Sequence, residues 1–142
     1  MKKASILGFT LVEIMVVMAV IMVLASLAIP GIMRSRITAM EMTALANIRT
    51  IRNSSDVYYV DHEAYPDSLL GLANTTPPYL EPKLASGIKQ GYEFIYGLGS
   101  GGFTVQANPS GLIKGRYFFS DEKGLIHYND SQPAGPEDAV FR

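Results

Sequence analysis

Apolar residues are distributed very unevenly along this chain of 142 residues. Between residues 9 and 29 almost every position is apolar, and the run closes at Pro30-Gly31. A helix of about 21 residues, rising 1.5 Å per residue, is long enough to cross the roughly 30 Å hydrocarbon core of a bilayer. Lys2 and Lys3 precede the run, and basic residues on that side favour a cytoplasmic amino end. The pattern therefore predicts a membrane-spanning helix whose chain leads outward.

After Gly31 the apolar positions recur at helical spacing. They are Ile37, Met40, Ala44, Ile48, Ile51, Ser55 and Tyr58. One stripe of this kind predicts an amphipathic helix that packs against the rest of the chain. Because proline disfavours helix in the residue before it, Pro66 predicts that the helix ends between His62 and Tyr65.

The remaining pattern predicts a connecting region and then a sheet. In the connecting region, residues 67–72 favour one short helical turn capped by Asp67 or Ser68. Pro77-Pro78 and Glu81-Pro82 are expected to break regular structure. Four strands are expected at residues 92–96, 103–107, 116–120 and 125–128, followed by an irregular tail.

Turns between the expected strands lie at residues 97–102, 108–111 and 121–124. Short antiparallel strands with one apolar face need a cover, which the amphipathic helix supplies. The fold class is therefore α+β, with a long N-terminal helix packed on a C-terminal antiparallel sheet of about four strands.

Composition narrows the possible functions. The net charge of −1 gives no basic field of the kind that binds nucleic acid, so no nucleic-acid partner is expected. The chain has no cysteine, which excludes disulfides, thiolate metal sites and cysteine nucleophiles. His62 and His127 have no partner at the spacing of a metal site or a catalytic triad. We therefore expect a protein that is not an enzyme.

One charge, Glu13, interrupts the apolar run. At the centre of a membrane helix an acidic residue costs about 2.5–3.5 kcal/mol on insertion scales, so it needs a partner or a function. A secretory signal peptide, with small residues at 25–28 for cleavage, would leave the acid unexplained. Its apolar region is also usually only about 7–15 residues long. A plain single-pass anchor explains the length of the run but not Glu13.

The string Gly8-Phe9-Thr10-Leu11-Val12-Glu13 resembles the type III signal of type IV pilins and type II secretion pseudopilins. Pro30 also matches that family. The resemblance implies the pilin fold, cleavage between Gly8 and Phe9 by a membrane-embedded prepilin peptidase, and N-methylation of Phe9. It divides the chain into a leader (1–8), a transmembrane and assembly half-helix (9–30), an amphipathic half-helix (31–64), a connecting loop (65–90), and a sheet with its tail (91–142).

Physical chemistry suggests a role for the motif. After cleavage Phe9 carries an α-ammonium group near the bilayer edge, one helical turn from Glu13. The carboxylate can pair with its own amine or with the Phe9 amine of a neighbouring subunit, which relieves its cost in a low dielectric. Pro30, with Gly31 beside it, is expected to kink or locally open the helix.

Arg34 and Arg36 follow the apolar run. In an assembly they can meet Glu41 or other acids of a neighbour, or they can remain solvated stem charges. Calcium is a further candidate, because the resemblance implies one ion in the carboxy-terminal loops of major pseudopilins. Carboxylates favour Ca²⁺, but their spacing here fits no known loop motif. The candidate ligands are Asp121, Asp130 and Asp138, with Glu122 and Glu137 nearby.

The resemblance implies a homo-oligomeric filament assembled from the bacterial inner membrane, with the head in the periplasm. The implied partners are the prepilin peptidase, an inner-membrane assembly platform and other minor pilins or pseudopilins. A compact head, Tyr65-Pro66 and the lack of a cysteine pair favour a type II secretion pseudopilin. A type IV pilus subunit for adhesion, twitching or DNA uptake is the alternative, and a membrane-tethered binding module is a more distant one.

Overall fold

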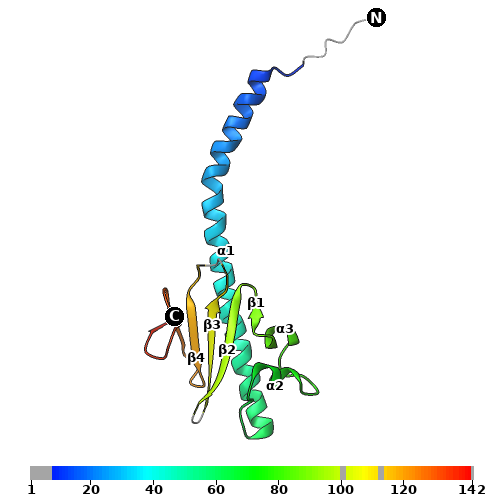
Figure 1. The fold of residues 1–142 in the computed structure, drawn as a ribbon, viewed down its shortest axis with the longest axis vertical. Helices are drawn as coiled ribbons and strands as arrows, with labels where there is room; N and C mark the ends of the chain where they lie inside the picture. The colour runs from blue at the N-terminus through cyan, green and yellow to red at the C-terminus, as the bar shows by residue number, and fades with distance from the viewer. Residues whose placement is uncertain (1–7, 100–101, 112–113, 142) are drawn as a thin grey trace, which may run out of the picture. The chain divides into compact units, whose positions relative to one another are not determined.

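The computed structural model describes residues 8–99, 102–111 and 114–141. The chain divides into two compact units, Met1–Arg36 and Ile37–Arg142. The elements, several of them labelled in Figure 1, are α1 (Leu11–His62), α2 (Leu69–Ala73), α3 (Pro82–Ala85), β1 (Ile88–Lys89), β2 (Tyr92–Gly99), β3 (Gly102–Pro109), β4 (Tyr117–Asp121), β5 (Ile126–Asn129) and β6 (Ala139–Val140).

The first unit consists of the apolar part of α1. Every described residue from 8 to 36 is exposed within the chain, including the large apolar side chains. By length and composition α1 qualifies as a helix able to cross a membrane. Helical structure continues through Pro30, and the Ser35 hydroxyl donates to the Gly31 carbonyl at 3.1 Å. The helix of the single chain is therefore not interrupted at Pro30-Gly31. A kink or local opening at this point stays a prediction.

The second unit is an antiparallel sheet packed on the later turns of α1 (Figure 1). Within the described residues six strands follow one another in the order β1-β2-β3-β4-β5-β6. The long central pair, β2 and β3, places Phe94 opposite Ala107 and Tyr96 opposite Val105. This order is a simple meander, so each strand pairs with the next one along the chain.

The core lies between one face of α1 and one face of the sheet. Alternate residues of β2 and β3 are buried, as a half-covered strand requires. The buried stripe of α1 confirms the predicted helix–sheet packing, since Ala44, Ile48, Ile51 and Ser55 are all buried. The largest fully buried side chains of the sheet are Tyr92, Phe103, Phe118 and Val105.

The expected count of about four strands was too low. The two additional strands, β1 and β6, are two-residue edge strands. Their positions are set by backbone pairing to β2 and β5. Two residues are too few to show an alternating pattern of apolar and polar positions in the sequence. The central strands also run further than expected, because Gly97–Gly99 and Asn108–Pro109 continue the β2–β3 ladder that was assigned to turns.

The connecting region contains two short helices. The first, α2, confirms the expected turn, and the Ser68 hydroxyl accepts from the Gly71 amide at 3.2 Å as its cap. The second, α3, was missed, since Pro82 was expected to end regular structure. Proline is favoured in the first helical turn, where its missing amide hydrogen is not needed. Pro82 therefore starts a helix instead of preventing one.

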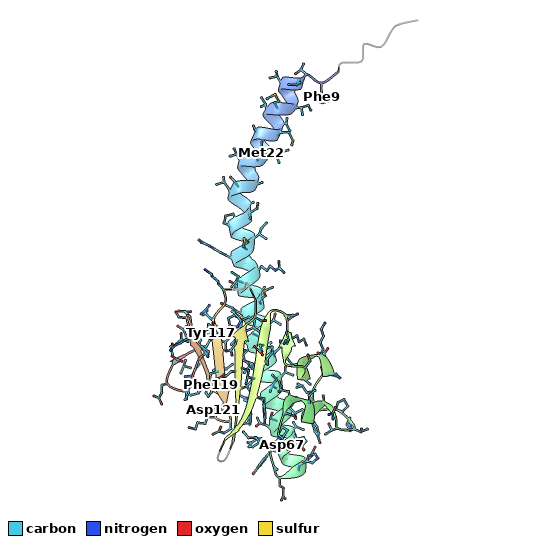
Figure 2. The ribbon with its side chains drawn as sticks, in the orientation of Figure 1. Phe9, Met22, Asp67, Tyr117, Phe119 and Asp121 are labelled. Carbon is cyan, nitrogen blue, oxygen red and sulfur yellow. The ribbon has the colours of Figure 1, made fainter. Side chains whose placement is uncertain are left out.

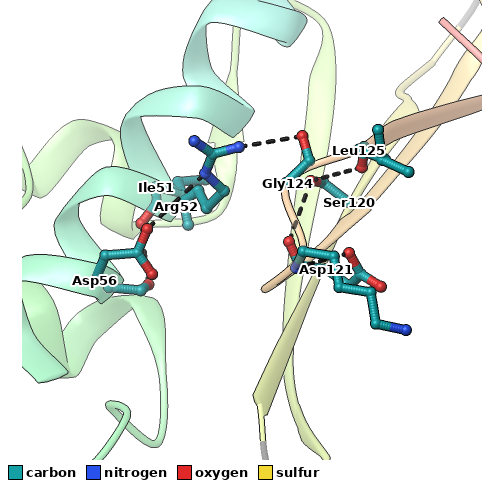
Figure 3. Close-up of polar contacts among 9 residues, drawn as sticks. Ile51, Arg52, Asp56, Ser120, Asp121, Gly124 and Leu125 are labelled. Carbon is teal, nitrogen blue, oxygen red and sulfur yellow. Dashed lines mark hydrogen bonds and ion pairs between the residues drawn. The ribbon is translucent and has the colours of Figure 1, made fainter.

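The turn between β4 and β5 is fastened to α1 by an arginine (Figure 3). The Arg52 guanidinium donates to the Gly124 carbonyl at 3.1 Å and lies 3.9 Å from the Asp56 carboxylate. Gly124 has φ of +84°, and a Cβ there would collide with the Arg52 guanidinium. Both the backbone conformation and the close approach therefore require glycine at this position.

An ion pair between a buried carboxylate and a partly exposed arginine joins α1 to the segment before β4. The side chain of Glu41 is only 9% exposed, and it accepts from the Arg116 amide at 3.0 Å and from the Arg116 guanidinium at 3.1 Å. The Tyr92 hydroxyl donates to the Arg116 carbonyl at 3.0 Å. Burial, with the nearby Glu41 carboxylate, raises the pKa of Tyr92, so this hydroxyl stays protonated. Position 115 favours glycine, because the Cβ of any other residue there would collide with the Tyr92 hydroxyl.

Aromatic rings complete the surroundings of Arg116. Its guanidinium carbon lies 5.4 Å from the ring centre of Tyr128 and 5.5 Å from that of Phe141. Phe141 in turn meets both Phe118 and Tyr128 edge to face. One arginine therefore links α1, β2, β5 and the C-terminal residues, in a site where cation–π contacts add to the ion pair.

Replacing Glu41 by glutamine should lower the free energy of unfolding by about 2 kcal/mol, because hydrogen bonds to charged groups contribute roughly 1.5–3 kcal/mol. Denaturant unfolding of the full chain in detergent micelles measures this. Tyrosine fluorescence is the probe, since the chain has eight tyrosines and no tryptophan.

The matched control is Glu81→Gln. Glu81 also pairs with a cation, Lys89 at 2.7 Å, but its side chain is 58% exposed. Exposed ion pairs contribute roughly 0–1 kcal/mol, so this variant should unfold almost as the unmodified chain does. Equal losses from the two substitutions would contradict a special role for burial at Glu41.

Candidate processing and assembly site

The start of α1 leaves the Gly8–Phe9 peptide bond outside the helix. Gly8, Phe9 and Thr10 are not helical, and α1 begins at Leu11. The Phe9 side chain is 83% exposed and projects from the end of the helix (Figure 2). A bond in this position is accessible to an enzyme without unwinding the helix.

Thr10 and Glu13 form a reciprocal cap at this helix start. One oxygen of the Glu13 carboxylate, Oε2, accepts from the Thr10 amide at 2.8 Å and from the Thr10 hydroxyl at 2.9 Å. The Glu13 amide donates to the Thr10 hydroxyl oxygen at 3.2 Å. This is the capping-box arrangement, which satisfies helix-end amides that have no partner within the helix. The carboxylate is thus satisfied inside its own chain.

Sequence reasoning missed this contact. It paired Glu13 with an amine and did not consider Thr10, although a threonine three residues before a glutamate is the signal of a capping box. The geometry still leaves room for another donor. Within the described residues the second oxygen of Glu13, Oε1, accepts no hydrogen bond, and a carboxylate offers about four lone-pair sites. An ammonium group can therefore join without displacing Thr10.

Glu41 already has a basic partner in its own chain. Its carboxylate is buried and already pairs with Arg116 of the same chain. The expectation that Arg34 or Arg36 meets Glu41 of a neighbour stays a prediction, and such a contact would have to compete with the bond that holds the segment before β4 to α1. Other acids remain open to these arginines.

The three candidate calcium ligands do not come together. Asp121 and Asp130 lie at opposite ends of the β4–β5 hairpin. Asp121 is next to Ser120, which pairs with Ile126, whereas Asp130 follows Asn129, which pairs with Tyr117 at the other end. Among the described residues no group of three or more histidines and acids is placed to hold a metal ion. These aspartates therefore do not fit one calcium cage, and calcium binding stays a prediction.

Asp138 has a structural task. Its carboxylate accepts from the Gly135 amide at 2.8 Å and from the Asn129 side chain at 2.9 Å. These two bonds, the backbone one first, hold the pKa of Asp138 below its usual value. Its own carbonyl lies 2.7 Å from a ring nitrogen of His127. The tail is therefore fastened to β5 by polar contacts that compete with any metal.

The other histidine is also engaged in structural contacts. The His62 ring stacks on Tyr58 with centres 4.1 Å apart, and one ring nitrogen lies 3.1 Å from the Tyr58 carbonyl. Neither histidine meets a nucleophile in these contacts. The prediction that the chain is not an enzyme is consistent with this arrangement and remains a prediction.

Comparison with known proteins assigns the amino-terminal segment. The profile of the prokaryotic N-terminal methylation motif matches residues 4–29. In this segment the chain is similar to type IV pilins and pseudopilins. This confirms the resemblance that was inferred from Gly8, Phe9 and Glu13, and the α+β fold agrees with it.

The curated relatives include several proteins named type II secretion system core protein G. The chain is 41% identical over 86 residues to that of Escherichia coli K12, covering 60% of this chain and 59% of the relative. It is 36% identical over 93 residues to those of Aeromonas hydrophila and Pseudomonas aeruginosa, covering 65% of this chain and 65% and 66% of the relatives. The chain thus spans less than two thirds of these relatives. No solved structure matches it significantly.

Thr10→Val should loosen the first turn of α1, because valine keeps the shape but removes the hydroxyl that caps the helix. Loss of such a cap costs about 1 kcal/mol, which corresponds to roughly fivefold faster amide exchange in the first turn. Hydrogen exchange of the Glu13 amide in micelles measures this. Thr10→Ser keeps the hydroxyl and should exchange as the unmodified chain does, whereas equal exchange in all three chains would refute the cap.

Proposed function

We propose that this chain is a structural subunit of a type II secretion pseudopilus, a filament that drives protein export. It is made as a single-pass inner-membrane precursor with the head in the periplasm, and it is cut between Gly8 and Phe9. The proposal rests on one observation. The apolar half of α1 is exposed, and near its start it carries an acid, Glu13, that takes part in capping the first turn. The similarity to core protein G supports the choice of machine.

The exposed half-helix requires an apolar environment. Its side chains have no cover within the chain, including Ile14, Val20 and Leu24, each more than half exposed. Burial of apolar surface contributes roughly 25 cal/mol per Å², so such a helix is stable only in lipid or against other helices. Lipid covers it in the precursor, and copies of the same helix cover it in the filament.

Glu13 distinguishes these two states. In the precursor Thr10 satisfies one oxygen of the carboxylate. In the filament the free Phe9 amine of an adjacent subunit reaches the other oxygen, which has no internal partner among the described residues. An ion pair in a low dielectric is strong, whereas an unpaired charge there is costly. Glu13 therefore favours the assembled state and sets the register between subunits.

A surface type IV pilus remains the second candidate. It uses the same processed amino end, and the similarity to core protein G leaves more than a third of this chain unmatched. In either machine the proposed partners are the prepilin peptidase, an inner-membrane assembly platform and other pilin-like subunits.

Glu13→Leu should leave cleavage and membrane insertion intact while filament yield falls at least tenfold, since the contact that neutralises the Phe9 amine is lost. Mass spectrometry of the mature chain reports cleavage after Gly8 and methylation of Phe9. Electron microscopy and shearing assays report filaments in cells that carry the secretion genes.

Val12→Leu is the matched control, because it changes the adjacent exposed apolar residue and keeps the acid. It should be cleaved and assembled normally. Normal filaments from Glu13→Leu would remove the assembly role of the acid. A mature chain that begins elsewhere than Phe9 would overturn the proposed function itself.

A further inference from the structure

A pocket with aromatic walls lies near the end of α1 in the second unit. Its volume is about 460 Å³. We call it the tyrosine pocket, and its lining includes Tyr59, Ala64, Tyr65, Asp67 and Leu98, together with two glycines of the β2–β3 hairpin. Figure 2 shows Asp67 in this part of the head, beside the last turns of α1. The tyrosine pocket lies on the surface of the second unit, and none of its lining residues belongs to the processing site.

The walls of the tyrosine pocket are partly apolar, and its aromatic rings pack on one another and on the core. The Tyr59 ring stacks on the Tyr65 ring with centres 4.6 Å apart. Tyr65 rests in turn on the buried ring of Phe103, at 5.0 Å. Tyr59 is 45% exposed and Leu98 is 50% exposed, so an apolar surface faces outward on both sides. A flat side chain can lie on this surface without moving the core.

One carboxylate belongs to the lining of the tyrosine pocket. Asp67 is an exposed member of the lining. Burial, followed by the charges of Asp56, Tyr59 and Glu122, raises the pKa of Tyr65. A flat cation suits aromatic faces beside carboxylates, and arginine combines a planar charged group with stacking on rings. The pocket therefore has the chemistry to receive a guanidinium group.

We propose that the tyrosine pocket of one copy receives Arg36 of a second copy of this chain. Arg36 is exposed, and Ile32 and Met33, one turn before it on α1, are exposed apolar side chains. A segment with a cation beside apolar side chains is complementary to a pocket with one carboxylate, Asp67, beside apolar walls. Glu41, the other acid considered for Arg36, is buried and paired within its own chain.

Three other arginines of the chain fit less well. Arg116 pairs with Glu41, and Arg52 with the Gly124 carbonyl and Asp56. Arg49 is exposed, but one turn away along its helix lie Asn53 and Ala46, which provide little apolar surface for Tyr59 and Leu98. Arg36 therefore matches the pocket in both charge and apolar surface.

The proposed contact joins two different surfaces of the chain. A surface that binds a different surface on the next copy produces open helical assemblies when the rotation does not close. The contact thus deepens the proposed filament function, on which it rests, and adds to the Phe9–Glu13 pair a second docking point that involves the head.

Paired cysteines test the contact directly, because the chain has no cysteine of its own. A chain carrying both Arg36→Cys and Asp67→Cys should form a ladder of disulfide-linked multimers under mild oxidation in cells that assemble filaments. Arg49→Cys with Asp67→Cys, and Arg36→Cys with Glu93→Cys, are the matched controls and should give no ladder. Glu93 is an exposed acid on β2.

Charge exchange provides the second measurement. Arg36→Glu and Asp67→Arg should each reduce filament yield, by roughly tenfold for loss of one partly desolvated cation contact. The double variant restores the attraction and should recover most of the yield. Filaments that form without the ladder and without this recovery would overturn the docking of Arg36, while leaving the proposed function standing. Correctly processed but filament-free unmodified chains would instead overturn the proposed function.

Discussion

The cost of placing a carboxylate on an apolar helix governs both parts of α1. Glu13 lies among exposed apolar side chains, and Glu41 lies against the sheet with its side chain 9% exposed. An ionised acid in either place needs donors close by. The chain supplies them in different ways, because Thr10 caps Glu13 locally whereas Arg116 reaches Glu41 from a segment distant in sequence.

The two carboxylates therefore differ in whether they can accept a further donor. Glu13 can accept one, whereas Glu41 already uses both oxygens. The Glu13 carboxylate is held on one oxygen, within the first turn of an exposed helix, so an arriving amine can bind without breaking the fold. The Glu41 carboxylate is held on both oxygens by a single arginine, which itself lies over the rings of Tyr128 and Phe141. Removing Glu41 from its partner would release the segment before β4. The first acid suits assembly, and the second secures the head.

Much of this could be predicted from the sequence, where the signal was local or periodic. The seven-residue spacing of Ala44 and Ile51 predicted the buried face of α1, and the position of Gly8, Phe9 and Glu13 before an apolar run predicted the family. Two misses were local, the Thr10–Glu13 cap and the short helix α3, and the others are non-local. The pairing of Glu41 with Arg116 joins residues 75 positions apart, and no spacing rule announces it. The edge strands β1 and β6 exist only because β2 and β5 offer them unpaired backbone groups.

The position of Glu41 also constrains how copies of the chain can meet. Because that acid is paired within its own chain, the proposed docking of a neighbour's Arg36 uses another carboxylate, Asp67, which lies beside exposed aromatic surface. A neighbour docked as proposed would lie where α1 finishes, whereas the proposed Phe9–Glu13 pair would form at the start of the same helix. Two contacts far apart along one helix resist rotation of the subunit far better than either alone. In the proposed assembly, an internal ion pair that stabilises the head thus leaves Asp67 as the carboxylate for the contact between copies.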